Sequence, residues 1–361
     1  MMHANSHQIA VSSRSGRWLK VGSASLLAIV LGLAAAPFQA ADLVEVRVGI
    51  NNVVSDAPFF IASKKGYFQE QGIKITFVSF DAGPKMIAPL GTGQLEVAAG
   101  AMSAGLFNAA ARGINIKVVA DKGSTPLQYD YMPILVRKAL VDSGKVKTYA
   151  DLKGMKVGEA GKGGSPGSKL NEALRSAGLG YKDVQHEYLG YPQHVLALMN
   201  GAIDASVTTE PSATQAIERG AAVRLTNTDP YANQQIAVLL YSGEFIGKMP
   251  LVAKKFMIAY LKGARFYNDA LKDGKFAGPN AAEVIAILSQ ETNVKDGALY
   301  RKMTPNGIHP DGKLNEASLV KDLQFYRDQG YIEGTIALEQ VVDTSFATAA
   351  VKELGVYQPR K

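Results

Sequence analysis

Short apolar segments alternate with stretches whose apolar positions recur at helical spacing through residues 45–226. Strands are predicted at the apolar runs EVRVGI, IKITFVSF, LEVAAG and INIKVVA, and again at MKVGEA, HEYLG, IDASVTT and AAVRLT. Helices are predicted to start at Pro58 and to cover residues 84–90, 103–111, 168–177, 192–200 and 211–219. Because short buried strands separated by helices are typical of parallel sheets covered on both faces, the pattern predicts an α/β fold.

The second half of this stretch repeats the first in weakened form. The matching segments are 46–49 and 155–158, 93–98 and 201–206, 111–118 and 218–225, together with Pro58 and Pro166. Since all four pairs keep the same order and nearly the same spacing, we expect two lobes of similar design. Lobe 1 is predicted to hold residues 42–131 and lobe 2 residues 132–237. Residues 238–361 are predicted to return to lobe 1 with helices at 253–271, 281–290, 318–329 and 339–354.

Two parallel α/β lobes place the loops at their strand ends on facing walls of one cleft. The extended apolar runs at 131–137 and 235–241 separate the two lobe patterns, so we expect them to cross between the lobes and act as a hinge. The predicted architecture is therefore a clamshell for a small molecule.

Residues 1–41 have the three-part layout of a secretory signal peptide. Three basic residues precede an uncharged apolar stretch at 21–36, and small residues follow. We expect cleavage near Ala40 or Ala41, with an uncleaved membrane anchor as the alternative. No later apolar run reaches spanning length, so the mature protein is predicted to be soluble and periplasmic.

The sequence contains no cysteine, which excludes disulfides, a lipid anchor on an N-terminal cysteine and thiol nucleophiles. The formal net charge of +7 falls to 7 − 3 = +4 without the three basic residues of the signal. Acidic and basic residues are interleaved along the rest of the chain, so no nucleic-acid partner is expected. With 47% apolar residues, we expect a sizeable core. We also expect the protein to be a monomer.

Polar residues at the predicted strand ends are the candidate ligand contacts. On lobe 1 they are Asn51, Asn52, Ser55, Asp56, Met102, Ser103 and Lys122, and on lobe 2 they are Gly163, Gly164, Ser165, Ser168, Thr208, Thr209 and Glu210. The Gly-rich run at 161–168 lies between a strand and a helix, where backbone N–H groups can face an anion or a carbonyl. A plain flexible loop is the alternative for this run, and Asp56 and Glu210 could instead serve only the starts of their helices.

No catalytic residue, metal site or cofactor is predicted. His186, His194 and His309 lack metal-ligand spacing, and no thiol is present as a nucleophile. We therefore expect the chain to bind its ligand without converting it. An exported hydrolase or isomerase on the same scaffold is the alternative.

Several blocks of the sequence resemble one family of exported solute-binding proteins. They are APFFIASKKGYFQEQGI, TYADLKGMKVG, GYPQHVLALMNGAIDASVTTEPSATQAIERG, NGIHPDGKLN and VVDTSFATAAVKELGVY, which together span the mature chain. In these blocks the sequence is similar to the periplasmic binders of thiamine-pyrimidine, sulfonate, taurine and nitrate, the NMT1/THI5-like family. The resemblance implies a two-lobed type II fold, and delivery of cargo to an inner-membrane ABC permease driven by a cytoplasmic ATPase.

The resemblance also bears on the site. It implies that Glu210 lies at a position that often touches the ligand. An aryl sulfinate desulfinase and the fungal pyrimidine-forming synthase resemble this family in fold, and both need a cysteine, which this chain lacks. The resemblance thus favours binding over catalysis.

The residues favour one ligand class without excluding a second. The Gly-rich run with Lys162, together with Lys122, favours an organic anion such as a sulfonate or a carboxylate. Asp56 and Glu210 favour the donor edge of an amino-pyrimidine, because unpaired acids beside a bound anion are costly. Since backbone donors at helix starts are present whatever the side chains, we expect the anion and keep the amino-pyrimidine as the alternative.

Overall fold

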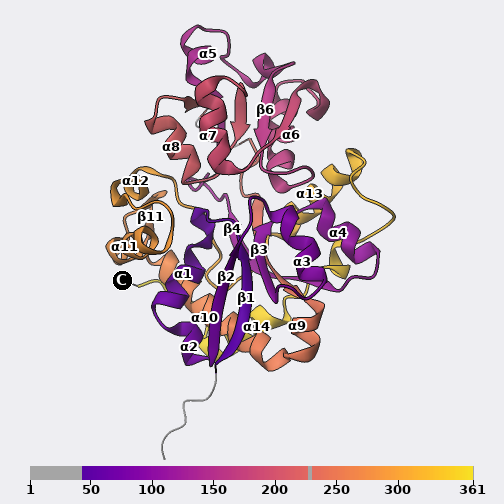
Figure 1. The fold of residues 1–361 in the computed structure, drawn as a ribbon, viewed down its shortest axis with the longest axis vertical. Helices are drawn as coiled ribbons and strands as arrows, with labels where there is room; N and C mark the ends of the chain where they lie inside the picture. The colour runs from indigo at the N-terminus through magenta and orange to yellow at the C-terminus, as the bar shows by residue number, and fades with distance from the viewer. Residues whose placement is uncertain (1–42, 227–229, 361) are drawn as a thin grey trace, which may run out of the picture. The chain divides into compact units, whose positions relative to one another are not determined.

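The computed structural model describes residues 43–226 and 230–360 (Figure 1). The predicted signal peptide at 1–41, with its cleavage site near Ala40 or Ala41, lies outside these residues. In the described part of the chain no helix has the length and apolarity needed to cross a bilayer.

A first sheet has the strand order β2-β1-β3-β10-β4. Its strands are β1 (Val44–Ile50), β2 (Ile73–Ser79), β3 (Val97–Ala101), β4 (Ile116–Ser124) and β10 (Gln235–Ser242). β1 runs parallel to β2 and β3, whereas β10 runs antiparallel to β3 and β4. We refer to this sheet and the helices packed on it as lobe 1.

A second sheet repeats the arrangement in the order β7-β6-β8-β5-β9. Its strands are β5 (Ile134–Arg137), β6 (Lys156–Glu159), β7 (Gln185–Tyr188), β8 (Ala205–Val207) and β9 (Ala222–Arg224). β6 runs parallel to β7 and β8, and β5 runs antiparallel to β8 and β9. We refer to this sheet and its helices as lobe 2.

The predicted α/β fold is confirmed, with one antiparallel strand added to each parallel-rich sheet. These added strands, β5 and β10, occupy most of the two runs that were predicted to cross between the lobes. Every residue of β10 is buried, and its edges pair with β3 and β4, so the run is a central strand and not an exposed hinge. The chain passes between the sheets just before each of these strands, between β4 and β5 and between β9 and β10.

Helices occupy the connections between the strands, as the sequence pattern predicts. In lobe 1 they are α1 (Ala57–Lys64), α2 (Tyr67–Glu70), α3 (Ile87–Gly91) and α4 (Ala104–Ala111), and in lobe 2 they are α5 (Lys138–Asp142), α6 (Ser165–Ser176), α7 (Tyr191–Asn200) and α8 (Ser212–Glu218). Figure 1 shows α6 and α7 beside β6. α6 starts three residues before its predicted start at 168, because Pro166 fits within the first helical turn, where its missing N–H costs nothing.

The chain after β10 is mainly helical. Its elements are α9 (Gly243–Lys248), α10 (Pro250–Asn268), the hairpin β11 (Leu271–Lys272) and β12 (Lys275–Phe276), α11 (Ala281–Glu291), α12 (Gly297–Lys302), α13 (Glu316–Asp328) and α14 (Ser345–Leu354). α10 packs on α1 and α2 of lobe 1 through aromatic contacts, with ring centroids 4.9 Å apart for Phe59 and Tyr260 and 5.0 Å apart for Phe68 and Phe256.

The single helix predicted at 339–354 is wrong in its first third. A short 3-10 turn at Leu338–Gln340 ends there, and α14 begins only at Ser345. Between them the chain is held along the edge of β4, where Val118 N donates to Val341 O at 2.7 Å and Asp343 N donates to Val118 O at 2.9 Å. Pairing with the sheet edge uses backbone groups that a continuous helix would need.

Candidate ligand-binding site

A small cavity of about 20 Å³ lies between the two lobes. Residues from lobe 1 line one side of it, namely Asn51, Val53, Ser55, Ala101, Lys122, Ile236 and Ala237. Tyr131 and Met132 of the first connection, with Tyr191 and Thr209 of lobe 2, line the other. The carboxyl ends of β1, β3 and β8 meet here, which is where α/β folds place their ligands.

A buried ion pair forms the lobe 1 wall. Lys122 Nζ lies 2.8 Å from Asp56 Oδ1 and donates to Ser55 Oγ at 3.0 Å, and both charged side chains are at most 1% exposed. The second carboxylate oxygen of Asp56 accepts from Val53 N at 2.9 Å. The third N–H of the Lys122 ammonium remains for the cavity that this residue lines. The predicted ligand contact at Asp56 is therefore indirect, since its carboxylate serves Lys122 and the start of the following turn.

Two residues with hydroxyls, Tyr131 and Thr209, line the other side of the cavity. Tyr131 and Thr209 are each 1% exposed, and neither hydroxyl completes a hydrogen bond of ordinary geometry within the described residues. Burial raises the pKa of Tyr131 well above its ordinary value, so its phenol keeps its proton. A side-chain hydrogen bond with Ser55 opposes part of that shift. Buried polar groups normally have partners, so the Thr209 hydroxyl, which has none in the described residues, is available to a ligand.

The Gly-rich run binds the opposite lobe. Gly163 O accepts from Ala104 N at 2.8 Å, and Ser165 N donates to Met102 O at 3.0 Å, which places Gly164 opposite Ser103 in an isolated antiparallel bridge. Ser165 Oγ also donates to Ile236 O at 2.7 Å. The run was predicted to offer backbone donors to an anion, but the Ser165 amide is already used by lobe 1.

Three other predicted ligand contacts near this run either bond another group of the protein or lie apart from the cavity. Ser168 Oγ donates to Asp322 Oδ1 of α13 at 2.7 Å. Met102 is fully buried in the core of lobe 1, and Ser103 Oγ is buried without a partner in the described residues, although neither residue lines the cavity. Burial raises the pKa of Asp322 to about 7, with the hydrogen bond from Ser168 acting in the opposite direction.

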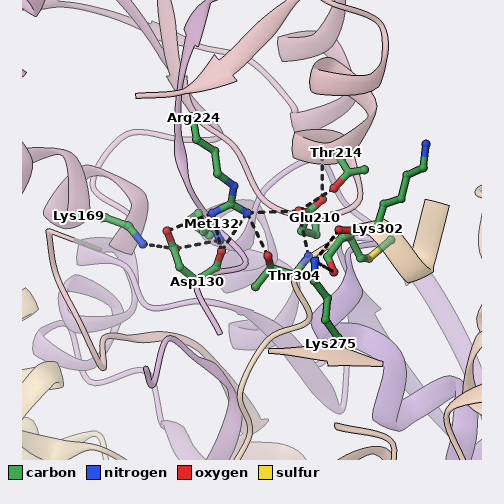
Figure 2. A network of polar contacts seen from close by, with 10 residues as sticks. Asp130, Met132, Lys169, Glu210, Thr214, Arg224, Lys275, Lys302 and Thr304 are labelled. Carbon is green, nitrogen blue, oxygen red and sulfur yellow. Dashed lines mark hydrogen bonds and ion pairs between the residues drawn. The ribbon is translucent and has the colours of Figure 1, made fainter. Parts of the chain in front are cut away.

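Glu210 serves the start of α8. Its carboxylate accepts from Thr214 N and from Thr214 Oγ1, both at 2.9 Å, and Arg224 Nη2 lies 3.6 Å away. Burial raises the pKa of Glu210, and these contacts oppose that shift. Figure 2 shows the carboxylate within a wider network in which Arg224 also reaches Asp130 and Thr304. This position fits the alternative stated above, a helix-start residue, better than a direct ligand contact.

The remaining two candidates point away from the cavity. Thr208 Oγ1 bonds His194 Nδ1 at 2.8 Å and Ser206 Oγ at 2.6 Å inside lobe 2. Asn52 Nδ2 donates to Ser79 Oγ at 2.9 Å on an exposed part of lobe 1. Of the fourteen candidates, the structure therefore brings together Asn51, Ser55, Lys122 and Thr209 around one cavity.

Sequence reasoning missed several residues of the lining, two of them aromatic. Tyr131 and Met132 fell in a run interpreted only as a hinge, and Tyr191 stood just before a predicted helix start at Pro192. The available signal was position, because Tyr191 follows the loop after β7 and Tyr131 precedes β5. Ile236 and Ala237 carried no such signal, since an apolar strand residue predicts burial and not ligand contact.

Two parallel-rich sheets joined by two connections, with a polar cavity between them, define a two-lobed periplasmic binding protein fold. The chain belongs to the NMT1-like family, whose sequence profile matches residues 39–289.

Two relatives are named for the binding of aliphatic sulfonates. The protein from Bacillus subtilis (strain 168) is 27% identical over 351 residues, covering 93% of this chain and 98% of that protein. The protein from Escherichia coli (strain K12) is 34% identical over 147 residues, which cover 41% of this chain and only 43% of that protein. Both names describe binding proteins.

Solved structures support the fold. The alkanesulfonate-binding protein from Xanthomonas axonopodis pv. citri, bound to MOPS, is similar with a TM-score of 0.67 and 21% identity, covering 84% of this chain and 99% of that one. The nitrate-binding protein from Synechocystis PCC 6803 is similar with a TM-score of 0.72 and 15% identity, covering 88% and 90%.

Enzymes also occur among the similar proteins. A 4-amino-5-hydroxymethyl-2-methylpyrimidine phosphate synthase from Aspergillus parasiticus is 26% identical over 159 residues, covering 43% of this chain and 42% of that protein. A desulfurization enzyme shares the fold with a TM-score of 0.55. Residues 163–167 of this chain also have the Gly-x-Ser-x-Gly spacing found around hydrolase nucleophiles. Ser165 Oγ, however, donates to a backbone carbonyl, and no histidine bonds it in the described part of the chain.

Within residues 43–226 and 230–360, no group of three or more His, Cys, Asp or Glu side chains is placed to hold a metal ion. The donors around the cavity are hydroxyls, one amide and one ammonium, which suit an oxygen-rich ligand.

Proposed function

We propose that this protein is an exported solute-binding protein which captures a small organic anion between its lobes and delivers it to an ABC importer in the inner membrane. The observation that carries the proposal is the cavity lined by Lys122 of lobe 1, by Tyr131 and by Thr209, whose buried hydroxyl has no hydrogen-bond partner in the described residues. The names of the sulfonate-binding relatives support the same class of ligand. The apolar N-terminal stretch supports export, with cleavage near Ala40 or Ala41.

Charge and hydrogen bonding together favour an anion. Asp56 neutralises Lys122, so the wall carries no net charge, but the donors that remain are the third ammonium N–H and two hydroxyls. A carboxylate or sulfonate oxygen can accept from all three. Hydrogen bonds to a charged acceptor contribute about 1.5–3 kcal/mol each, which offsets part of the cost of removing the anion from water.

The amino-pyrimidine alternative has less support. Its donor edge would need a free carboxylate. Asp56 Oδ1 completes no hydrogen bond in the described residues, but it lies 2.8 Å from Lys122 Nζ, and Oδ2 accepts from Val53 N. Glu210 accepts from Thr214 through both of its carboxylate oxygens. The enzymatic alternative is equally weakened, because Ser165 donates to the Ile236 carbonyl.

The size of the cavity implies that the lobes move. About 20 Å³ holds no more than a water molecule, so an organic anion enters only when the walls separate. The connections before β5 and β10 are where such bending would occur. Ligand that touches both walls would then favour a closed form over an open one.

The test uses residues 42–361 with a panel of sulfonates, carboxylates, nitrate and pyrimidines. A ligand that binds only the folded state raises stability by about 2.7 kcal/mol at a hundredfold excess over Kd, which a thermal shift detects. The ligand should be recovered unchanged. Thr209→Val should weaken binding by about tenfold or more, from loss of a hydrogen bond to a charged group.

A matched control separates binding from general damage. Thr92→Val removes an exposed hydroxyl that bonds only its own helix, so the affinity should not change. The proposal fails if no anion in the panel stabilises the protein, or if Thr209→Val binds the identified ligand as tightly as the native chain.

A further inference from the structure

A groove of about 480 Å³ lies outside the small cavity, between the same two lobes. The loop after β2, residues 81–85, lines it on lobe 1. Residues 160–162 after β6, residues 188–190 at the end of β7 and Gln193 of α7 line it on lobe 2. The proposed function uses none of these residues.

Sheet order places this groove as the outward continuation of the cleft. The cavity lies at the ends of β1, β3 and β8, toward the middle of each sheet. β2 is the next strand outward from β1, and β7 is the next outward from β6. The linings of the two spaces are adjacent. Asn51 Nδ2 of the cavity donates to Phe80 O, the residue before Asp81 of the groove, at 2.9 Å, and Tyr191 of the cavity directly follows Gly190 of the groove.

Lys162 leaves one positive charge in the groove uncompensated. Lys85 is paired with Asp81 at 2.8 Å, and both of these line the groove. Lys162 Nζ lies 5.2 Å from the centre of the Tyr331 ring and forms no ion pair with any described residue. The walls between these charges include Ala82, Pro84, Tyr188 and Leu189. Such walls suit a carbon skeleton rather than bare water.

We propose that the ligand of this protein is a dianion with two parts, a compact anionic head for the cavity and a carbon body that lies in the groove and ends in a second anionic group at Lys162. This inference rests on the proposed function, since it extends the same ligand outward. It narrows the substrate class from any small organic anion to those with two separated acidic groups on an apolar frame.

The gain in affinity from each part of the ligand follows from the surface it contacts in the groove. A body that buries about 60 Å² of carbon surface gains about 1.5 kcal/mol at 25 cal/mol per Å², which is about tenfold in Kd. Lys162 is solvent-exposed, so its attraction to a second acid is screened and worth about two- to fivefold.

The experiment titrates residues 42–361 calorimetrically at low ionic strength with two matched series. One series is methanesulfonate, benzenesulfonate and 3-sulfobenzoate, and the other is acetate, benzoate and isophthalate. In the series whose small head group binds, adding the ring should lower Kd about tenfold, and adding the second acidic group should lower it a further two- to fivefold. Lys162→Gln should remove only this last gain. Lys182→Gln changes an exposed lysine of lobe 2 outside the groove and should change none of the values.

The outcomes distinguish the two proposals. If the small heads bind but neither the ring nor the second acid improves Kd, the groove inference fails and the proposed function stands. If the dianion binds more tightly and Lys162→Gln leaves that gain intact, the assignment of Lys162 fails. If no member of either series binds, the organic-anion function fails and the inference fails with it.

Discussion

Replacing Lys122 by methionine should be the most damaging single change at the cleft. Methionine keeps most of the side-chain volume but leaves the Asp56 carboxylate, which is fully buried, without its cation. Its Oδ2 retains the Val53 amide, whereas Oδ1 loses the ammonium at 2.8 Å. Removing one member of a buried ion pair costs about 3–5 kcal/mol, because the remaining charge is uncompensated.

A double-mutant cycle tests the cause. Asp56→Asn together with Lys122→Met removes both charges, and asparagine can still accept from Val53 N. The double variant should therefore be more stable than Lys122→Met alone by about 2 kcal/mol or more, since replacing a whole buried pair is often close to neutral. Lys138→Met breaks an exposed i,i+4 pair with Asp142 and should cost only about 0.3–0.5 kcal/mol.

Urea unfolding followed by circular dichroism, at one pH and with unchanged m-values, measures all of these differences. The reasoning is refuted if Lys122→Met costs less than about 1 kcal/mol, or if the two substitutions at the pair simply add. A double variant that folds normally yet no longer binds the identified anion would confirm separately that Lys122 contacts the ligand.

Three further outcomes are expected. The pKa of Asp322 is raised by burial to about 7 in the folded protein, so the folded state holds a proton that the unfolded state loses near pH 4. The free energy of unfolding should accordingly fall as pH rises from about 4 to 7. This fall should be smaller in Asp322→Asn, and in the exposed control Asp328→Asn it should be as large as in the native protein. Ser168→Ala removes the hydrogen bond between α6 and α13, and should raise the radius of gyration of the ligand-free protein in X-ray scattering; equal curves would indicate that Ser168 does not hold the lobes together. Glu210→Gln should lower stability by about 1 kcal/mol and leave Kd for the anion within twofold, whereas a large loss of affinity in calorimetry would restore Glu210 as a ligand contact.

Local patterns in the sequence were sufficient for the elements and their order. Apolar strands such as β3 and β10 bury both faces, so their composition alone predicts them. Pro58 and Pro166 predict helix starts because proline fits the first turn. The repeat and the family blocks predicted the two-lobed fold for the same reason. Each is read from neighbouring residues without any knowledge of distant contacts.

Strand direction and the end of the last helix required the tertiary structure. β10 is as apolar as any parallel strand, and only its partners β3 and β4 show that it runs antiparallel. The residues before α14 have no strand pattern of their own, yet Val118 of β4 pairs with them across more than two hundred positions of sequence. Long-range pairing of this kind overrides local helix propensity.

The sequence by itself determined the fold class, the two-lobed repeat, the lack of any thiol chemistry and the loops in which a site could lie. Only the tertiary structure decided which polar groups in those loops are free to bind a ligand. Lys122 and Asp56 lie far apart in the chain but neutralise each other, the Ser165 amide is used by lobe 1, and Thr209 keeps an unpaired hydroxyl. The physical reason is that a hydrogen-bonding group is available only when no other group of the fold has satisfied it, and that depends on residues which meet only in space.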